Sequence, residues 1–248
     1  MRRLRFLVAP GALAEGRGSI VRLPEDEARH LRVTLRGRQG MEIYLFDGEG
    51  AEWRAEVEAV SAAEIRAVLL EAGTAAVDPP LEIVVLQAVS RDEAFESALE
   101  QMTCLGAASI VPLLVDRSAS ARPPNARRLA RWRRIVREAS KLSWRRTLPQ
   151  VHDPAPVSEL AVPGRPGSID LLLDVGAPPG SLKAALAGPA PPSVRLAVGP
   201  EGGFTPAERC ALLGAGFAAV SIGPRVLRTE HAGPAALALI LAAWGDVG

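Results

Sequence analysis

The sequence predicts an α/β protein of two domains, and three observations support this. Short strands of alternating polarity, separated by turn residues, fill residues 6–70. Apolar strand-like runs and segments of helical spacing then alternate from residue 81 onward. The composition, 48% hydrophobic with a net charge of +1 over 248 residues, is that of an ordinary globular protein. A small β-barrel followed by a parallel α/β sheet is therefore expected.

The first domain is expected to hold four strands, at residues 19–23, 41–46, 52–57 and 64–69. The turn residues 47–50, Asp-Gly-Glu-Gly, predict a hairpin between the second and third of them. Pro24 is expected to open a short helix over residues 25–31. The stretch from Gly73 to Pro80 ends in Asp-Pro-Pro and is expected to separate the domains, which gives a barrel at 1–72 and a larger domain at 73–248.

The second domain is expected to alternate buried strands with amphipathic helices. The predicted strands are 81–89, 109–114, 171–174, 195–198 and 218–222, and the predicted helices are 93–105, 127–142 and 235–244. Two stretches rich in proline and glycine, 153–167 and 176–192, are expected to be loops or surface connections. Runs of this kind are typical of a parallel sheet covered by helices on both faces.

The distribution of charge and of metal-ligating residues narrows the function classes. Basic residues concentrate in 1–40 and 121–147, although the total charge is near zero. Two distant cysteines and three histidines give neither a disulfide framework nor a metal site. The longest apolar run near the C-terminus, 235–244, is too short to cross a bilayer. We expect a cytoplasmic protein with no metal and no membrane partner.

The segment 196–208, Leu-Ala-Val-Gly-Pro-Glu-Gly-Gly-Phe-Thr-Pro-Ala-Glu, predicts a strand, a glycine-rich loop and a helix start. Gly199, Gly202 and Gly203 remove side chains where a ligand would lie against the backbone. Thr205 and Glu208 fit a capping box around Pro206, so the helix is expected to begin directly after the loop.

Loops at the carboxyl ends of parallel strands meet at one edge of a sheet, where ligands bind. Three such loops are expected here, at 174–179, 199–204 and 223–230, and together they predict one pocket. The sequence contains no G-x-G-x-x-G, P-loop or G-x-S-x-G motif, so a dinucleotide site, a P-loop and a hydrolase nucleophile elbow are not supported.

Paired with the segment 221–232, Ser-Ile-Gly-Pro-Arg-Val-Leu-Arg-Thr-Glu-His-Ala, the glycine-rich segment resembles the signature pair of the RsmE family. The resemblance extends to Arg5-Phe6, to residues 29–33 followed by Gly40, to Asp116-Arg117-Ser118 and to the tryptophan-containing helix. It therefore covers nearly the whole chain.

The resemblance implies a SPOUT-class methyltransferase that acts on N3 of a uridine in the decoding region of 16S ribosomal RNA. It implies a PUA-like barrel for RNA, a trefoil knot in the α/β domain, and a homodimer. The methyl donor is S-adenosyl-L-methionine, with S-adenosyl-L-homocysteine as product. The residues that the resemblance places around the donor are Leu173, Val198, Gly199, Glu201, Gly202, Ile222, Gly223, Leu227 and Thr229.

Methylation at N3 requires loss of a proton and stabilisation of the negative charge that develops. Glu230 and Glu201 are the carboxylates nearest the implied donor, and each is a candidate base or a helix-capping residue. Arg228 is the candidate for stabilising charge or gripping phosphate. His231 is a candidate base or a packing residue.

Candidate RNA-binding residues follow from the likeness of the barrel to an RNA-binding module and from the family motifs. They are Arg3, Arg5, Arg29, His30, Arg32, Arg36, Arg91 and Arg145. The arginines of the helix 127–142 are expected either to follow phosphates or to form an ordinary solvated face. The substrate implied is 16S rRNA, alone or in the small ribosomal subunit.

The chain departs from the family pattern at residues 91, 101, 104, 141 and 142. Arg91 stands where lysine is usual, and the family's Glu-Gln-Ser-Gly-Arg is here Lys-Leu-Ser-Trp-Arg at 141–145. These changes leave open a SPOUT enzyme with another RNA target and a non-catalytic RNA-binding or ribosome-assembly protein. A small-molecule nucleotide enzyme is a third alternative.

Overall fold

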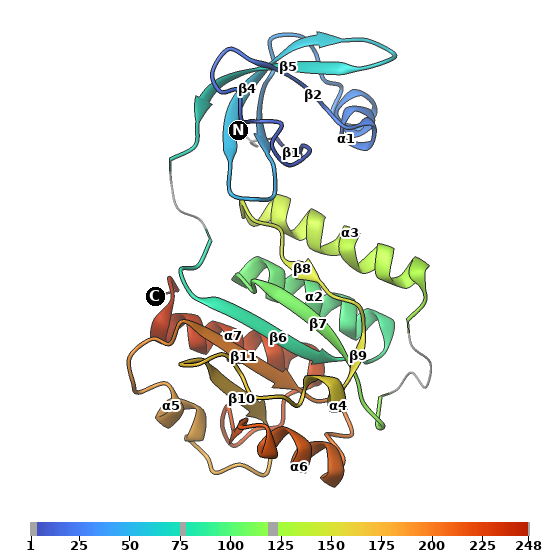
Figure 1. Ribbon diagram of the computed structural model, residues 1–248. Helices are drawn as coiled ribbons and strands as arrows, with labels where there is room; N and C mark the ends of the chain where they lie inside the picture. Colours follow the sequence, from blue (N-terminus) through green and yellow to red (C-terminus); the bar gives the residue numbers. More distant parts are fainter. Residues whose placement is uncertain (1–3, 75–77, 119–123, 248) are drawn as a thin grey trace. The chain divides into compact units, whose positions relative to one another are not determined.

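The computed structural model describes residues 4–74, 78–118 and 124–247. By their internal contacts, Met1–Asp78 and Ser140–Leu148 form one compact unit, and Pro79–Ala139 and Pro149–Gly248 form a second. The first unit thus extends past residue 72 and takes in a segment that the sequence assigned to the second domain. Figure 1 shows the elements of both units.

The first unit is a curled five-stranded sheet with a short helix. Its elements are β1 (Arg5–Leu7), β2 (Ile20–Arg22), α1 (Glu25–Arg29), the π-helical turn η1 (His30–Thr34), β3 (Glu42–Phe46), β4 (Glu52–Val60) and β5 (Ile65–Ala72). The strand order is β1-β3-β4-β5-β2, and only the β1–β3 pair is parallel. Two register shifts interrupt the β4–β5 pairing, and irregularities of this kind bend a strand and increase its twist.

Alternation along the strands explains the core of the first unit. Ala55 and Val57 on β4, and Ile65, Ala67 and Leu69 on β5, are fully buried, while residues between them reach the surface. The predicted hairpin is confirmed: β3 and β4 are antiparallel, and Asp47 accepts hydrogen bonds in the turn from the backbone N–H groups of residues 49 and 51.

Buried charge pairs hold the segment Ser140–Leu148 within the first unit. Arg5 donates to Glu52 (2.6 Å) and to the backbone carbonyl of Ser140 (2.9 Å). Lys141 pairs with Glu27 at 2.8 Å. Charge-assisted hydrogen bonds in a buried setting are stronger than neutral ones, so these pairs dock a segment that lies far from the sheet in sequence.

Trp144 also contributes to this docking. Its φ of 66° lies in the left-handed region that glycine favours, at the position where the related pattern has glycine. The indole packs edge-on against Tyr44, with ring centroids 5.4 Å apart. Aromatic packing therefore offsets the cost of the backbone conformation here.

The second unit is built on a seven-stranded parallel sheet. Its strands are β6 (Glu82–Ala88), β7 (Ser109–Leu114), β8 (Gln150–Val151), β9 (Ala155–Pro156), β10 (Ile169–Leu173), β11 (Ser193–Val198) and β12 (Ala218–Val220). Its helices are α2 (Asp92–Leu105), α3 (Ala126–Leu142, whose last residues belong to the first unit), α4 (Val157–Leu160), α5 (Ser181–Ala185), α6 (Pro206–Gly214) and α7 (Thr229–Trp244). The order is β12-β10-β11-β6-β7-β8, with β9 also beside β7.

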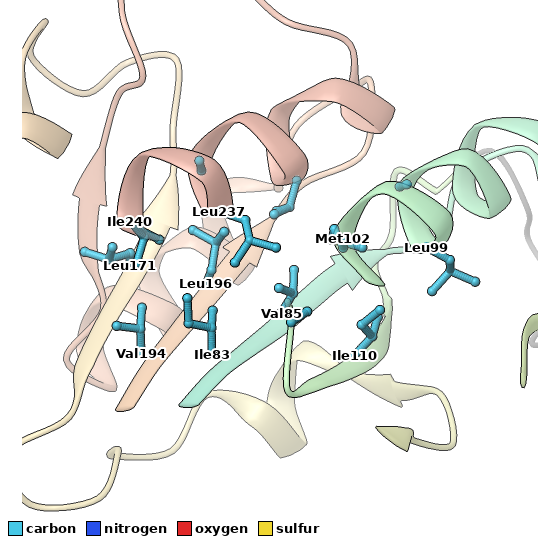
Figure 2. Close-up of a cluster of buried hydrophobic side chains, with 14 of the residues drawn as sticks. Ile83, Val85, Leu99, Met102, Ile110, Leu171, Val194, Leu196, Leu237 and Ile240 are labelled. Carbon is cyan, nitrogen blue, oxygen red and sulfur yellow. The ribbon is translucent and has the colours of Figure 1, made fainter. Parts of the chain in front are cut away.

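Helices cover both faces of this sheet, as the apolar strands predict. On one face, Ile83, Val85, Leu171, Val194 and Leu196 of the strands pack against α2 and α7. Figure 2 shows this cluster, with Leu99 and Met102 from α2 and Leu237 and Ile240 from α7. On the other face, strand residues pack against α4 and α6. The predicted α/β architecture is confirmed.

The structure corrects the predicted start of one helix and adds elements to two stretches. Helix α7 begins at Thr229 rather than at residue 235, and it continues through Pro234. Proline weakens a helix interior because it lacks an N–H, but Gly233 and Pro234 are buried, so packing decides here. The stretches 153–167 and 176–192, predicted as loops, contain β9 with α4 and α5, respectively. Within the described residues, no helix has the length and apolar character needed to cross a membrane.

The capping box at the start of α6 is confirmed, and its energetic contribution is measurable. The Thr205 hydroxyl accepts a hydrogen bond from the Glu208 N–H, and the Glu208 carboxylate accepts one from the Thr205 N–H at 2.7 Å.

We expect Thr205→Ala to lower the free energy of unfolding by about 1 kcal/mol. Urea denaturation measures this change. Thr205→Ser retains the hydroxyl and should stay near wild type; equal losses in both variants would contradict a capping role.

Candidate functional site

Three loops meet at the carboxyl edge of the parallel sheet. They follow β10, β11 and β12, at residues 174–179, 199–204 and 221–228, and these strands are neighbours in the order β12-β10-β11. Because the strands are parallel, their carboxyl ends lie at the same edge, where ligands bind in open α/β sheets. The predicted convergence of the three loops is confirmed, although the third was expected at 223–230 and ends at Arg228, because α7 begins at Thr229.

The glycine-rich loop after β11 leaves room beside its backbone. A Cβ atom on Gly199 would lie 3.1 Å from the Phe204 ring, so a side chain would not fit there without a shift. Gly203 has a φ of 66°, and its N–H bonds the carbonyl of Pro200 in a tight turn. A Cβ atom on Gly203 or Gly223 would meet no other atom within 4 Å. Backbone of this kind is accessible to a ligand.

Side chains from neighbouring connections hold this loop at both ends. The Thr229 hydroxyl donates to the carbonyl of Gly199 at 2.8 Å. Arg117, in the connection after β7, donates to the carbonyl of Gly202 at 3.0 Å. The preceding backbone N–H, of Asp116, donates to the Glu208 carboxylate of the capping box at 2.8 Å. The loop is thus tied to α7 and to the exit of β7.

An ion pair joins the β10 exit to α6. Arg209 donates to Asp174 at 2.6 Å, and the N–H of Gly176 donates to the same carboxylate at 2.8 Å. Burial acts to raise the pKa of Asp174, but the hydrogen bonds and the charge of Arg209 outweigh it and hold the pKa below its usual value. Asp174 is therefore ionised at neutral pH.

The residues predicted to bind the methyl donor lie in these loops or directly beside them. Leu173 and Val198 end their strands, Gly199, Glu201 and Gly202 form the glycine-rich loop, and Ile222, Gly223 and Leu227 lie in the loop after β12. Thr229 is the first residue of α7, and its buried hydroxyl is engaged with Gly199.

The predicted catalytic residues lie on two of the same loops or directly after them. The Arg228 side chain is 82% exposed, whereas that of Glu230 is 16% exposed, and the two charged groups are 3.9 Å apart. Glu201 is exposed in the glycine-rich loop, and His231 is exposed in the first turn of α7. Arg228 is thus available to a substrate.

Four of the predicted RNA-binding residues follow one another on the surface of the first unit: Arg29, His30, Arg32 and Arg36. Arg29, His30 and Val33 help to line a surface hollow of about 610 Å³. Two backbone irregularities lie in the stretch 30–36. Residues 30–34 form a π-helical turn, and Arg36 has a φ of 53°. Both features are enriched at functional sites.

Other predicted RNA contacts lie elsewhere. Arg5 and Arg145 are only 6% and 3% exposed, because they pair internally with Glu52 and Asp78. Arg91 is exposed at the start of α2, and Arg3 lies outside the described residues. We therefore leave Arg5 and Arg145 out of any RNA surface.

Several arginines of helix α3 form ion pairs and are therefore less available to RNA than the sequence suggests. Its arginines pair with acidic residues within the second unit: Arg128 with Asp92, Arg131 with Glu96, Arg133 with Asp153, and Arg137 with Glu138. Much of its positive charge is balanced locally, which fits a solvated and ion-paired face.

Internal contacts account for several departures from the RsmE pattern. Gln101 bonds the side chain of Ser97, and Lys141 is paired with the buried Glu27. The Cys104 thiol lies 4.0 Å from the carbonyl of Ala139. Arg91 and Leu142 remain exposed. Changes at residues 101, 104 and 141 thus serve the packing of each unit.

Sequence reasoning missed Gln87 and gave no role to Arg117. Gln87 was detectable, because it is the one polar residue in the otherwise apolar run Ile83–Val89. Arg117 carried no such signal, since an exposed arginine after a strand is common. Within the described residues, no group of three or more His, Cys, Asp or Glu side chains is arranged to hold a metal ion.

Comparison with known proteins identifies the class of protein to which this chain belongs, that of RNA methyltransferases. Residues 77–241 match the model of the RNA methyltransferase domain, which covers well over half of the chain. A solved structure of a ribosomal RNA small subunit methyltransferase E from Neisseria gonorrhoeae, bound to S-adenosyl methionine, is 31% identical. The similarity covers 100% of both chains with a TM-score of 0.91. A Legionella pneumophila structure in complex with the same cofactor is 28% identical over 99% of this chain and 100% of its own, with a TM-score of 0.88.

A curated relative gives the particular family. Ribosomal RNA small subunit methyltransferase E of Synechocystis is 34% identical over 239 residues, covering 95% of this chain and 76% of the relative. The chain belongs to this family, RsmE.

The ion pair of Asp174 predicts a dependence of stability on acid. Its pKa is lowered in the folded state, so its contribution is fully present above the unfolded value of about 3.9. That contribution is lost as the pH falls through the folded-state pKa. We expect the difference in free energy of unfolding between wild type and Asp174→Asn to be constant from about pH 5 to 7. The difference should shrink below about pH 4.

Urea denaturation across this pH range measures the difference, with Asp246→Asn in the exposed C-terminal residues as the matched control. A difference that grows on acidification would contradict the ion-pair account.

Proposed function

We propose that this protein transfers the methyl group of S-adenosyl-L-methionine to N3 of a uridine in the decoding region of 16S ribosomal RNA, releasing S-adenosyl-L-homocysteine. The observation that carries the proposal is the set of loops at the carboxyl edge of the sheet, in a chain of the RsmE family. The relative from Neisseria gonorrhoeae was solved with S-adenosyl methionine.

The loops fit this donor. A flat adenosine needs backbone groups at close range, and Gly203 and Gly223, where a Cβ atom would meet no other atom within 4 Å, leave that approach open. Apolar groups of Leu173, Ile222 and Leu227 supply a surface of the kind that binds small molecules. We assign donor binding to these residues together with Val198 and Glu201, while Thr229, whose buried hydroxyl is bonded to Gly199, supports the loop.

The donor supplies a methyl group on a sulfonium, and the protein must supply position and proton transfer. Holding the two reactants in line removes much of the barrier. Glu230 or Glu201 accepts the N3 proton, and the exposed Arg228 stabilises the negative charge that develops on the uracil ring. The distance of 3.9 Å between Arg228 and Glu230 supports their acting at one place.

The first unit is proposed to be the PUA-like domain that docks RNA. Arg29 and His30 would contact phosphates and bases at the hollow beside η1, which Glu25 and Asp26 also line, and Arg32 and Arg36 would extend this surface along the chain. Arg91, at the start of α2, is a further candidate on the second unit. Phosphate contacts of this kind weaken steeply with salt.

Two further features of the family are proposed for this chain. β12 lies at the sheet edge beyond β10, yet the following α7 packs on β11, β6 and α2. This return path supports a trefoil knot. Leu239, Ala242 and Ala243 form an exposed apolar strip on α7, which supports a homodimer. A ribosomal substrate implies a cytoplasmic location.

The internal contacts of Gln101, Cys104 and Lys141 weaken the case for a different RNA target, because these departures are used in packing. A non-catalytic RNA-binding or ribosome-assembly protein would bind donor and RNA without turnover, so an assay of methyl transfer separates it from an enzyme.

Methyl transfer to undermethylated small ribosomal subunits tests the proposal. With labelled S-adenosylmethionine, label should enter 16S RNA, and mapping should place it at N3 of one decoding-region uridine. Arg228→Ala should lower the rate by about 100-fold or more, as for loss of one electrostatic group at an active site, while donor binding changes little. Binding of donor and RNA without label transfer would favour the non-catalytic alternative, and label at another nucleotide would favour another target.

The strained backbone of Arg36 predicts a trade between stability and RNA affinity. A non-glycine residue in the left-handed region costs about 1 kcal/mol or more, and asparagine tolerates this region better. Arg36→Asn should therefore raise the free energy of unfolding by up to about 1 kcal/mol while weakening RNA binding. Arg165→Asn, at the exposed amino edge of the second unit's sheet, is the control with the same charge loss. Unchanged RNA affinity in Arg36→Asn would remove Arg36 from the RNA surface.

A further inference from the structure

A chain of buried polar groups runs beneath the carboxyl-edge loops. Gln87, the penultimate residue of β6, is 0% exposed. Its side-chain amide donates to the Thr229 hydroxyl at 3.1 Å, and that hydroxyl donates to the carbonyl of Gly199 at 2.8 Å. Three elements distant in sequence, β6, the start of α7 and the exit of β11, therefore meet at one hydrogen-bonded point.

The chemistry of threonine gives this chain a direction. A hydroxyl has one proton to donate, and Thr229 uses it on Gly199. The same oxygen is then free to accept the amide proton of Gln87. Removing the threonine hydroxyl would break both of these hydrogen bonds, whereas removing the Gln87 amide would leave the bond from Thr229 to Gly199 in place.

A glutamine at position 87 lowers the stability of the folded protein. Its side-chain oxygen is buried and has no hydrogen-bond partner among the described residues, and an unpaired buried carbonyl costs free energy. An apolar side chain of similar volume would avoid that cost. A buried polar group that is incompletely paired calls for a role beyond stability.

The backbone of α7 is fitted closely around Gln87. A Cβ atom on Gly233 would lie 2.8 Å from the Gln87 oxygen and 3.3 Å from the Met102 sulfur. Gly233 therefore lets the first turns of α7 approach β6, which sets Thr229 within reach of both Gln87 and Gly199. The glutamine, the glycine and the threonine form one local arrangement.

We infer that Gln87 and Thr229 are positioning residues that fix the separation between the glycine-rich loop and the loop that leads into α7. The inference rests on the proposed function, in which these two loops are opposite walls of the donor site. Arg117, bonded to Gly202, holds the far end of the same loop. A loop ordered before binding costs less conformational entropy when a ligand arrives.

Calorimetric binding of S-adenosylhomocysteine to the full chain tests the inference. Thr229→Val keeps the shape of the side chain without the hydroxyl, and we expect its dissociation constant to rise about tenfold. Thr229→Ser retains the hydroxyl and should stay within about threefold of wild type. Gln87→Met conserves volume and should weaken binding less than Thr229→Val, because the bond from Thr229 to Gly199 remains.

Two further readouts separate positioning from a general loss of stability. In the unliganded protein, amide hydrogen exchange of residues 201–204 should be faster in Thr229→Val than in Thr229→Ser. Joining Gln87→Met to Thr229→Val should add little to the loss, since both act through one hydroxyl. If Thr229→Val does not fold, the Gln87→Met measurements decide.

Wild-type affinity and unchanged exchange in Gln87→Met and Thr229→Val would overturn the inference, as would equal losses in the valine and serine variants. A wild-type protein that binds no S-adenosylhomocysteine would instead contradict the proposed function itself, so the two failures are distinguishable.

Discussion

All strands of the second unit run in one direction, and the rest of the molecule's chemistry depends on this constraint. Parallel pairing sends every strand exit to the same edge, so loops separated by tens of residues in sequence converge there. It also requires burial on both faces, which α2 and α7 provide on one side and α4 and α6 on the other. The edge is therefore rigidly supported from beneath, while the loops themselves remain open.

The loops are held by side chains from the elements and connections around them as well as by their own hydrogen bonds. Thr229 and Arg117 donate to the carbonyls of Gly199 and Gly202, and Asp174 pairs with Arg209. A glycine-rich loop has high conformational freedom, and external hydrogen bonds are one way to restrict it without adding side chains that would fill the ligand space. The site therefore combines a loop without large side chains and polar side chains behind it that fix its position.

Local signals predicted much of this from the sequence. The capping box of Thr205 and Glu208, the buried strands and the convergence of three loops all follow from short-range patterns. Contacts distant in sequence did not. Arg5 and Arg145 fall in segments rich in basic residues, but the acidic partners that bury them, Glu52 and Asp78, lie 47 and 67 residues away in sequence. Their burial, and the membership of Ser140–Leu148 in the first unit, depend on those pairs.

The central claim is that the carboxyl-edge loops bind the methyl donor. Amide hydrogen exchange of the wild-type protein, with and without saturating S-adenosylhomocysteine, tests it most directly. The account predicts slower exchange on binding within residues 199–204 and 222–229, with little change at the amino edge of the sheet. Protection confined to other segments, or none at saturation, would contradict it.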